Sequence, residues 1–589
     1  MEYVSMLKNL WNNLEDKKHY LVIYYIMHTI SIVGILIQPY AFSMIINIIQ
    51  MNKENMISDV IFWMEIYALG FVIFNFFHRV GRLVERRAAF FAKKNFIVSI
   101  YAKLHKLPIQ WHSNNHSGNV IDRVNKAADS LYDFGQCQAM CIEVIIKFFG
   151  SLIMLTLISP VISCVSILTG FLMIYVTKKL YTIAVPEYRE QNEGFHKISA
   201  TLFDYIKNIT TIITLRLGNL ARKDLAKRLD EILPHIVKEN HVTQVKCLVS
   251  ELLVLLLNLG LILYYIVVQK NLGEAIMAGS ITAIFQYLGQ FVSSVQFYSF
   301  SYEDIIHWDT NYQSIKLIDE EYERIYRNKN YLCESTEINN SVSNWKDITI
   351  RLDNYSYDSE KANLKNIFVQ LRRGRKIAFI GESGAGKSTF LKIIRGLLDV
   401  DNIKITIDEK VADERILENL TSLIPQEPEI FENTIRYNIT MGIEADQKEV
   451  DKAAYLACFD KIVENLPNGY DTDIRENGVN LSGGEKQRLA LARGFFSINN
   501  SSIILLDEPT GSLDAATEMS VYSRVFEALD DQCVVSVLHR LHLLKFFDYI
   551  YVFKKGIIVE EGSLEELMNS DVGEFKRLWK EYLITKEEK

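Results

Sequence analysis

The stretch Lys376–Phe390, KIAFIGESGAGKSTF, decides the fold of the C-terminal part of the chain. Its first five residues have the apolar character of a buried strand, and the segment after the glycines has helix character. The glycines let backbone N–H groups approach an anion closely, and a helix start favours negative charge. This pattern predicts a phosphate loop in an α/β nucleotide-binding domain, in which Lys387 neutralises the β- and γ-phosphates of ATP and Ser388 offers its hydroxyl to Mg²⁺. The predicted ATP-binding residues are Gly381, Glu382, Ser383, Gly384, Ala385, Gly386, Lys387, Ser388 and Thr389.

A second stretch, SIILLDEPTGSLD at Ser502–Asp514, supplies the acidic half of such a site. A fully apolar strand ends in Asp507, which is placed to hold Mg²⁺ directly or through water. Glu508 follows, in position to take a proton from the attacking water, and a general base contributes about 10²–10⁴-fold in rate. Together the two stretches predict a P-loop ATPase.

A second glycine-rich turn, in VNLSGGEKQRLALAR at Val479–Arg493, also opens a helix, so Ser482, Gly483 and Gly484 form another anion site. Its core, LSGGEKQR, resembles the signature sequence of ATP-binding-cassette (ABC) proteins. In that family, this site closes over the γ-phosphate of an ATP held by a second chain. One chain here carries one cassette, so the resemblance implies a dimer, with a homodimer and a heterodimer both open.

The remaining landmarks of the ABC family are present in order. The resemblance implies that Tyr357 stacks on adenine, that Gln426 senses Mg²⁺ and the membrane domain, and that Asp514 lies in the dimer-contact loop. It also implies that His539 contacts the γ-phosphate and that Glu476 takes the acidic position before the signature. The catalytic residues implied are Glu508, His539 and Gln426, and the metal ligands implied are Ser388, Gln426 and Asp507.

Some positions depart from the family pattern. Glu485 stands where exporters usually have glutamine, and Asn402 and Glu409 take the places of glycines in the hairpin DVDNIKITIDEK. EPTGSLD is also less typical of exporters than a version with alanine and serine. None of these changes removes a catalytic group, so we expect an active ATP site.

The N-terminal half is dominated by apolar runs. A helix needs about 20 apolar residues to cross a bilayer, and six stretches qualify, at roughly 19–40, 60–77, 138–158, 161–181, 248–268 and 281–300. The long stretches after the second and fourth spans are rich in Lys and Arg, whereas the loops on the opposite side hold almost none. The positive-inside rule therefore places both termini, both long loops and the ATPase domain in the cytosol, below the cytoplasmic membrane.

The two long loops keep helical periodicity, which predicts helices that extend into the cytosol and turn back near HSNNHSGNV (112–120) and DYIKNITTI (204–212). The first, LHKLPIQWHSNNHSGNVIDRV, is similar to the first intracellular loop of exporter-type half-transporters. His105, His112 and His116 near its turning point are interpreted as solvated turn residues. Glu143 and Lys147, four residues apart in the third span, either pair with each other or contact a transported molecule.

The sixth span contains several glutamines and aromatic residues, including Gln286 and Gln290. Such a face fits an amphipathic cavity and equally fits packing between helices. The polar stretch after residue 327 is typical of a linker. We therefore expect a membrane α-helical domain of six transmembrane helices (1–327), a linker (328–346), and a P-loop α/β nucleotide-binding domain (347–589), in the arrangement of ABC exporters.

The composition excludes some classes of protein. The net charge of the 589 residues is −8, so no basic footprint for nucleic acid is present. The seven cysteines include no CxxC pair, which indicates reduced thiols rather than a disulfide framework. Cys137 and Cys141 share a helix face, but no other ligands cluster near them to favour a metal site.

The resemblance implies ATP-driven export of an amphipathic or hydrophobic substrate (a drug, lipid or peptide) by alternating access. The partners expected are a second half-transporter chain, membrane lipid and the substrate. Two alternatives stay open. One is an importer of the same fold, with a siderophore-like substrate. The other is an ATP-gated channel or regulator, against which intact Glu508 and His539 argue.

Overall fold

The computed structural model describes residues 2–51, 55–328, 345–356, 364–398, 400, 403–413, 415–474, 481–498, 501–570 and 573–587. The chain divides into two compact units, residues 1–331 and 332–589. Tyr357, Glu476 and Asn402 lie outside the described residues.

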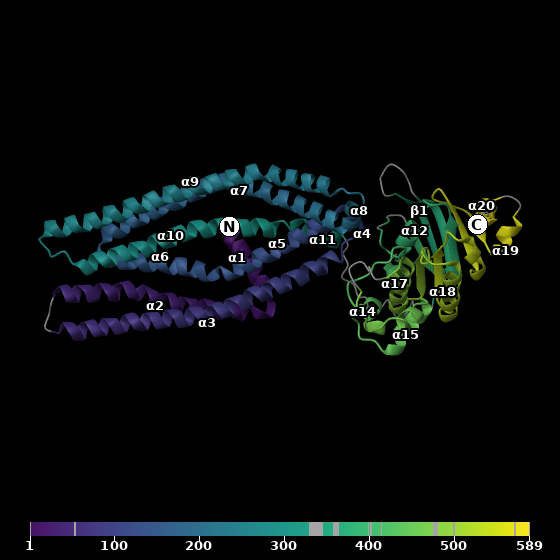
Figure 1. Ribbon diagram of the computed structural model, residues 1–589, viewed down its shortest axis with the longest axis horizontal. Helices are drawn as coiled ribbons and strands as arrows, with labels where there is room; N and C mark the ends of the chain where they lie inside the picture. The colour runs from purple at the N-terminus through teal and green to yellow at the C-terminus, as the bar shows by residue number, and fades with distance from the viewer. Residues whose placement is uncertain are drawn as a thin grey trace. The chain divides into compact units, whose positions relative to one another are not determined.

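Long helices make up the first unit, and α2 and α3 run side by side in it, as do α7 and α9 (Figure 1). The helices are α1 Glu2–Asn13, α2 Lys18–Met51, α3 Met56–Leu104, α4 Ile109–Asn114, α5 Ser117–Gln136, α6 Gln138–Ile158, α7 Pro160–Lys207, α8 Ile209–Thr214, α9 Gly218–Leu272, α10 Ala278–Gln313 and α11 Lys316–Asn328.

The helical extensions beyond the predicted spans are continuous with the apolar segments, as the sequence predicts. The first loop turns back through α4 and the second through α8. Among the described residues, five helical segments are long and apolar enough to cross a membrane: Glu15–Met51, Met56–Leu104, Ser117–Ile158, Pro160–Leu180 and Gly218–Leu272.

The sixth predicted span lies in α10, which is not among those five because its glutamines lower its hydropathy. This helix packs against α2, α5, α6 and α7. Its apolar residues Ile284, Leu288 and Phe291 are fully buried. A helix that is surrounded by other helices does not contact lipid along its whole surface. It therefore tolerates amide side chains that would be unfavourable on a lipid-facing helix.

Small residues bring the first two long helices together. A Cβ added at Gly34 of α2 would lie 2.8 Å from the carbonyl oxygen of Gly70 in α3, and one added at Gly70 would lie 2.7 Å from the oxygen of Gly34. Glycine at both positions permits the close backbone approach that van der Waals packing between membrane helices requires.

The second unit contains two sheets. An antiparallel sheet has the order β2-β1-β4-β5, and a six-stranded sheet has the order β10-β9-β3-β8-β7-β6, parallel apart from β10. The strands are β1 Asp347–Tyr355, β2 Leu364–Arg372, β3 Lys376–Gly381, β4 Ile403–Ile407, β5 Lys410–Ala412, β6 Thr421–Ile424, β7 Ile503–Asp507, β8 Cys533–Val537, β9 Tyr549–Lys554 and β10 Ile557–Gly562.

Successive side chains along the central strands point to opposite faces of the larger sheet, so a hydrophobic core forms on each face. In β3, Ala378 and Ile380 join one cluster, whereas Ile377 and Phe379 join the other. The helices that surround the sheets are α12 Lys387–Ile394, α13 Arg415–Leu420, α14 Ile435–Thr440, α15 Gln447–Leu456, α16 Asp460–Glu464, α17 Gly483–Ser497, α18 Ala515–Ala528, α19 Leu564–Asn569 and α20 Glu574–Glu587.

The hairpin that lacks its usual glycines still turns through left-handed backbone. Asp408 has φ 46° and Glu409 has φ 68° between β4 and β5. The conformation that glycine would adopt freely is therefore imposed here on two acidic residues, in line with the place assigned to Glu409 from the sequence.

Candidate active site

Four parallel strands bring the predicted ATP-site residues to one edge of the larger sheet. Phe379 of β3 pairs with Val537 of β8, and Val537 pairs with Asp507 of β7. The phosphate loop, His539 and Glu508 therefore leave the sheet at the same level, because the carboxyl ends of parallel strands share an edge. Gln426 follows β6, the neighbour of β7.

The phosphate loop connects β3 to α12 through glycines with positive φ, a backbone conformation that other residues rarely adopt. Gly381, Gly384 and Gly386 have φ values of 142°, 79° and 100°. A Cβ at Gly381 would lie 2.1 Å from the carbonyl oxygen of Phe553, so only glycine fits there. The loop ends at the start of α12, whose N-terminus favours an anion.

Lys387 lies inside this loop and is only 4% exposed. Its ammonium group donates to the carbonyl oxygens of Gly381 (2.8 Å) and Glu382 (2.9 Å). Burial lowers the pKa of Lys387, and the nearby carboxylates of Glu508 and Asp507 oppose that shift. The arrangement places a partly desolvated cation inside the phosphate loop, held by two of its backbone carbonyl groups.

Ser388 and Asp507 meet across the site. The Ser388 hydroxyl donates to Asp507 at 2.6 Å. Burial raises the pKa of Asp507, and the hydrogen bond from Ser388 opposes that shift. A hydroxyl and a buried carboxylate are the oxygen donors that suit Mg²⁺, so the pair fits that ion.

Glu508 lies at the meeting point of three loops. One carboxylate oxygen is 2.6 Å from Nε2 of His539, and the other accepts a hydrogen bond from the Gln426 amide at 2.8 Å. The backbone of Glu508 is left-handed, with φ 48°. Strain of this kind persists where the surrounding structure fixes a functional side chain.

The N-terminus of α17 is a second candidate anion site. Ser482 and Glu485 form a capping box in which the Glu485 carboxylate accepts from the Ser482 N–H at 2.7 Å. Nothing lies within 4 Å of a Cβ added at Gly483. The helix therefore starts where the sequence predicts, and its first turn already holds one carboxylate.

Two residues that the sequence did not single out, Gln487 and Arg540, help to hold the loop before α18. The Gln487 side chain of α17 accepts from the Ser512 N–H at 2.7 Å, and Arg540 donates to the Leu513 carbonyl at 2.8 Å. Asp514 caps α18 by accepting from the N–H of Thr517 at 3.0 Å. Contacts between distant loops carry no local sequence signal, although Gln487 stands inside the signature stretch.

Two comparisons with known families cover both units. Residues 21–295 match the ABC transporter transmembrane region, and residues 364–511 match the ABC transporter family. The chain is an ABC transporter. It joins a membrane domain and an ABC ATPase domain in one polypeptide.

Individual relatives and a solved structure agree with this assignment to the ABC transporters. The chain is 39% identical over 236 residues to the mitochondrial iron-sulfur clusters transporter ATM1 of Yarrowia lipolytica, a match covering 39% of this chain and only 33% of that protein. It is 29% identical over 492 residues to a putative multidrug export ATP-binding/permease protein of Staphylococcus aureus (strain NCTC 8325 / PS 47), which covers 80% of each. A solved bacterial Atm1-family ABC exporter with ATP bound has the same fold, with a TM-score of 0.78, 23% identity and coverage of 96% of this chain and 99% of that one.

The two long loops that follow the second and fourth predicted spans of this ABC transporter contact each other through histidine–aspartate pairs. His116 caps α5, and its Nε2 lies 2.8 Å from Asp204 of the second loop. Buried His196 of α7 lies 2.5 Å from Asp122 of α5. His116 is exposed to solvent at the turn, as interpreted from the sequence, and it also joins the two loops.

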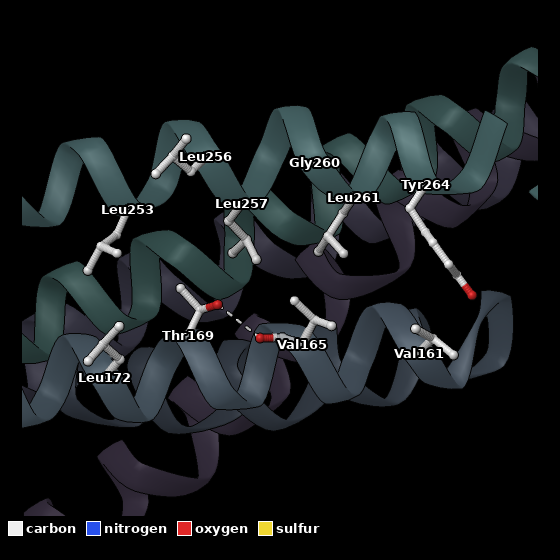
Figure 2. A pocket seen from close by; sticks show the side chains of 10 residues that line it. All are labelled: Val161, Val165, Thr169, Leu172, Leu253, Leu256, Leu257, Gly260, Leu261 and Tyr264. Atoms are coloured by element: carbon white, nitrogen blue, oxygen red, sulfur yellow. Dashed lines mark hydrogen bonds between the residues drawn. The ribbon is translucent and has the colours of Figure 1, made fainter. Parts of the chain in front are cut away.

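In the membrane domain, Glu143 and Lys147 form the intrahelical ion pair that is one of the two predicted alternatives. An apolar groove of about 420 Å³ lies elsewhere, between α7 and α9. Figure 2 shows its side chains, all apolar apart from Thr169 and Tyr264. The Thr169 hydroxyl donates to the Val165 carbonyl of its own helix at 2.9 Å, so it offers little to a ligand.

Proposed function

We propose that this ABC transporter hydrolyses ATP to export an amphipathic or hydrophobic molecule (a drug, lipid or peptide) across the cytoplasmic membrane. The observation that carries the proposal is the convergence on Glu508. Its two oxygens contact His539 and Gln426, beside the Ser388–Asp507 pair and the phosphate loop. A ligand-gated regulator would not require this catalytic set.

Each side chain has a role in hydrolysis. Lys387 and the N–H groups of residues 381–389 bind the β- and γ-phosphates, and Tyr357 stacks on adenine. Glu508 accepts a proton from the attacking water, while His539 contacts the γ-phosphate. The residues that would hold Mg²⁺ are Ser388, Asp507 and Gln426, and that ion would supply positive charge at the phosphates.

A second chain completes the site. The N-terminus of α17, with Ser482, Gly483 and Gly484, closes over the γ-phosphate held by the partner, and the loop containing Asp514 lies at the contact. The partner is a second copy of this chain or a different half-transporter. Two nucleotides would then be enclosed between two cassettes.

Alternating access links the two units in this proposal. The Lys- and Arg-rich loops favour a cytosolic position for both termini and for the ATPase domain. The fold shared with an Atm1-family exporter and the similarity to a multidrug export protein favour outward transport. The Yarrowia lipolytica relative is named for iron-sulfur clusters and the Staphylococcus aureus relative for multidrug export, so the substrate class stays broad at this level.

The first test is ATP hydrolysis by this chain expressed alone and reconstituted in lipid discs, with Glu508→Gln as the blank. Activity above the blank would support a self-sufficient homodimer. Activity equal to the blank in folded protein would contradict the homodimer, and mixing with a candidate partner chain would then be required to restore hydrolysis.

The direction of transport is tested separately in inside-out membrane vesicles, with ATP added to the outer solution. Export predicts that a substrate which stimulates hydrolysis accumulates inside these vesicles. Accumulation only in right-side-out vesicles with ATP trapped inside would overturn the export direction and leave the ATPase assignment intact.

A further inference from the structure

A second cavity, of about 430 Å³, lies between α2, α3 and α10 within the membrane domain. It differs from the groove between α7 and α9 because amide side chains line it. Gln38 comes from α2, and Gln286 and Gln290 come from α10. Gln286, Gly289 and Gln290 are spaced i, i+3 and i+4, so they lie on one face of their helix.

Two of these amides hold buried polar atoms without hydrogen-bond partners. The side-chain nitrogen of Gln38 and the side-chain oxygen of Gln290 are both inaccessible to solvent and unpaired among the described residues. Buried polar groups are normally hydrogen-bonded, and leaving them unsatisfied is costly. Gln38 and Gln290 both line the cavity, so a small turn of each side chain would present one unpaired donor and one unpaired acceptor to a molecule bound there.

The lining is uncharged. None of the nine residues that line the cavity carries a charge. Phe42 and Tyr67 add aromatic surface, and both are about 40% exposed. A charged ligand would enter a membrane site with no opposite charge to meet it, which is unfavourable. The volume falls in the range of pockets that hold small organic molecules.

We propose that this cavity binds a neutral amphipathic molecule that carries an amide or a similar pair of hydrogen-bonding groups. The ligand's carbonyl accepts from Gln38, its N–H donates to Gln290, and its apolar part lies against Phe42 and Tyr67. This inference rests on the proposed transport function and narrows its substrate class. It excludes anionic molecules and metal–thiolate clusters as ligands of this cavity.

Gly289 provides a way to fill the cavity without disturbing the protein. Nothing lies within 4 Å of a Cβ added there, so a larger side chain would project into open space. Gly260 is a matched control, because it also has nothing within 4 Å of an added Cβ and lines the other groove, between α7 and α9. Leucine at either position adds the same volume to a membrane helix.

The test uses dansyl-leucinamide and dansyl-leucine, which are alike in size but differ in that the second carries a carboxylate. Saturable binding of each probe to the full chain in lipid discs is measured by energy transfer from protein tryptophan, with empty discs subtracted. The neutral probe is expected to bind at least about tenfold more tightly than the acid. Gly289→Leu is expected to weaken binding of the neutral probe by about tenfold or more, and Gln38→Leu and Gln290→Leu by about five- to tenfold each. The control Gly260→Leu is expected to leave the affinity for that probe unchanged.

Three results would overturn the inference: no saturable binding of dansyl-leucinamide, equal affinity for the two probes, or equal loss from Gly289→Leu and Gly260→Leu. Hydrolysis of ATP without probe is measured on the same discs. Loss of that basal hydrolysis would count against the proposed function, whereas intact hydrolysis without selective binding would count against the cavity alone.

Discussion

Replacing Glu485 with glutamine tests whether the N-terminus of α17 binds a phosphate. The Glu485 carboxylate accepts from the Ser482 N–H at 2.7 Å, and the Glu485 N–H donates to the Ser482 hydroxyl at 3.3 Å. A capping box forms with glutamine as well as with glutamate. The substitution therefore removes one negative charge and keeps the start of the helix.

The size of the effect follows from the spacing of N–H groups in one helical turn. A phosphate bound by the neighbouring N–H groups would lie roughly 7 Å from the Glu485 carboxylate. Two unit charges at about that distance repel by about 0.6 kcal/mol in water and by about 2.4 kcal/mol at an effective dielectric constant of about 20. These energies correspond to factors of about 3 and about 60 in affinity.

The assay is ATP hydrolysis in lipid discs as a function of ATP concentration, at low and at high salt. Glu485→Gln is expected to reach half its maximal rate at an ATP concentration lower than the wild type by a factor in that range. Salt shortens the reach of the repulsion, so the difference should shrink from about 20 mM to about 500 mM salt. The Ser482 N–H holds the pKa of Glu485 below its ordinary value, so the carboxylate stays ionised and the difference should not change between pH 6 and 8. Glu527→Gln, which removes the same charge from an exposed position on α18, is the control.

Equal ATP dependence for wild type and Glu485→Gln at low salt would refute this reasoning. So would a difference that persists undiminished at high salt, because a screened repulsion between anions cannot behave in that way. A higher ATP requirement in the variant would mean that the carboxylate supports the site rather than opposing the nucleotide.

Three further predictions concern the ATPase domain. Glu508→Gln is expected to bind ATP as the wild type does and to release phosphate about 10²–10⁴-fold more slowly, and a rate within about threefold of wild type would remove Glu508 as the base. Lys387→Ala is expected to lose binding of a fluorescent ATP analogue, because no other described cation lies inside the phosphate loop; unchanged affinity would contradict the site assignment. Contacts from Arg577 and then Lys554 lower the pKa of Glu574 to about 2 from its ordinary 4.5, so its stabilising effect is present above pH 4.5 and is lost as pH falls toward 2. The thermal midpoint of Glu574→Gln should accordingly lie below that of the wild type at pH 7 and approach it below pH 4.5; a gap independent of pH would show that charge plays no part.

The ATP site was predictable because its chemistry needs particular residues next to one another in the chain. The phosphate loop puts its glycines, lysine and serine within nine positions, and Asp507 and Glu508 are adjacent. Gln426 and His539 lie far from Glu508 in sequence, and their assignment to the ATP site came from resemblance to a family rather than from any local pattern. Their contacts with Glu508 follow from the order of strands β3, β8, β7 and β6, which periodicity alone does not specify.

The contacts missed from the sequence depend on the docking of distant helices. His116 meets Asp204, and His196 meets Asp122, across 88 and 74 residues of chain. Each partner is by itself an ordinary polar residue on a long helical extension of the membrane domain. The pairing exists only once α5 and α7 lie side by side, so no hydrophobic pattern or motif length encodes it.

The low hydropathy of α10 is better explained by a ligand-binding role of its glutamines than by their being merely tolerated between packed helices. If Gln290 only packed between helices, its oxygen would have found a partner there, as the Thr169 hydroxyl finds one within its own helix. Instead, the Gln290 oxygen and the Gln38 nitrogen remain unpaired on facing helices that border one cavity. A membrane helix that gains nothing from such amides would be more stable with leucine in their place, because each amide costs free energy in an apolar surrounding. Retaining both therefore points to a ligand that makes the missing hydrogen bonds, and Gln290, one of the glutamines that lower the hydropathy of α10, helps to identify where the transported molecule should bind.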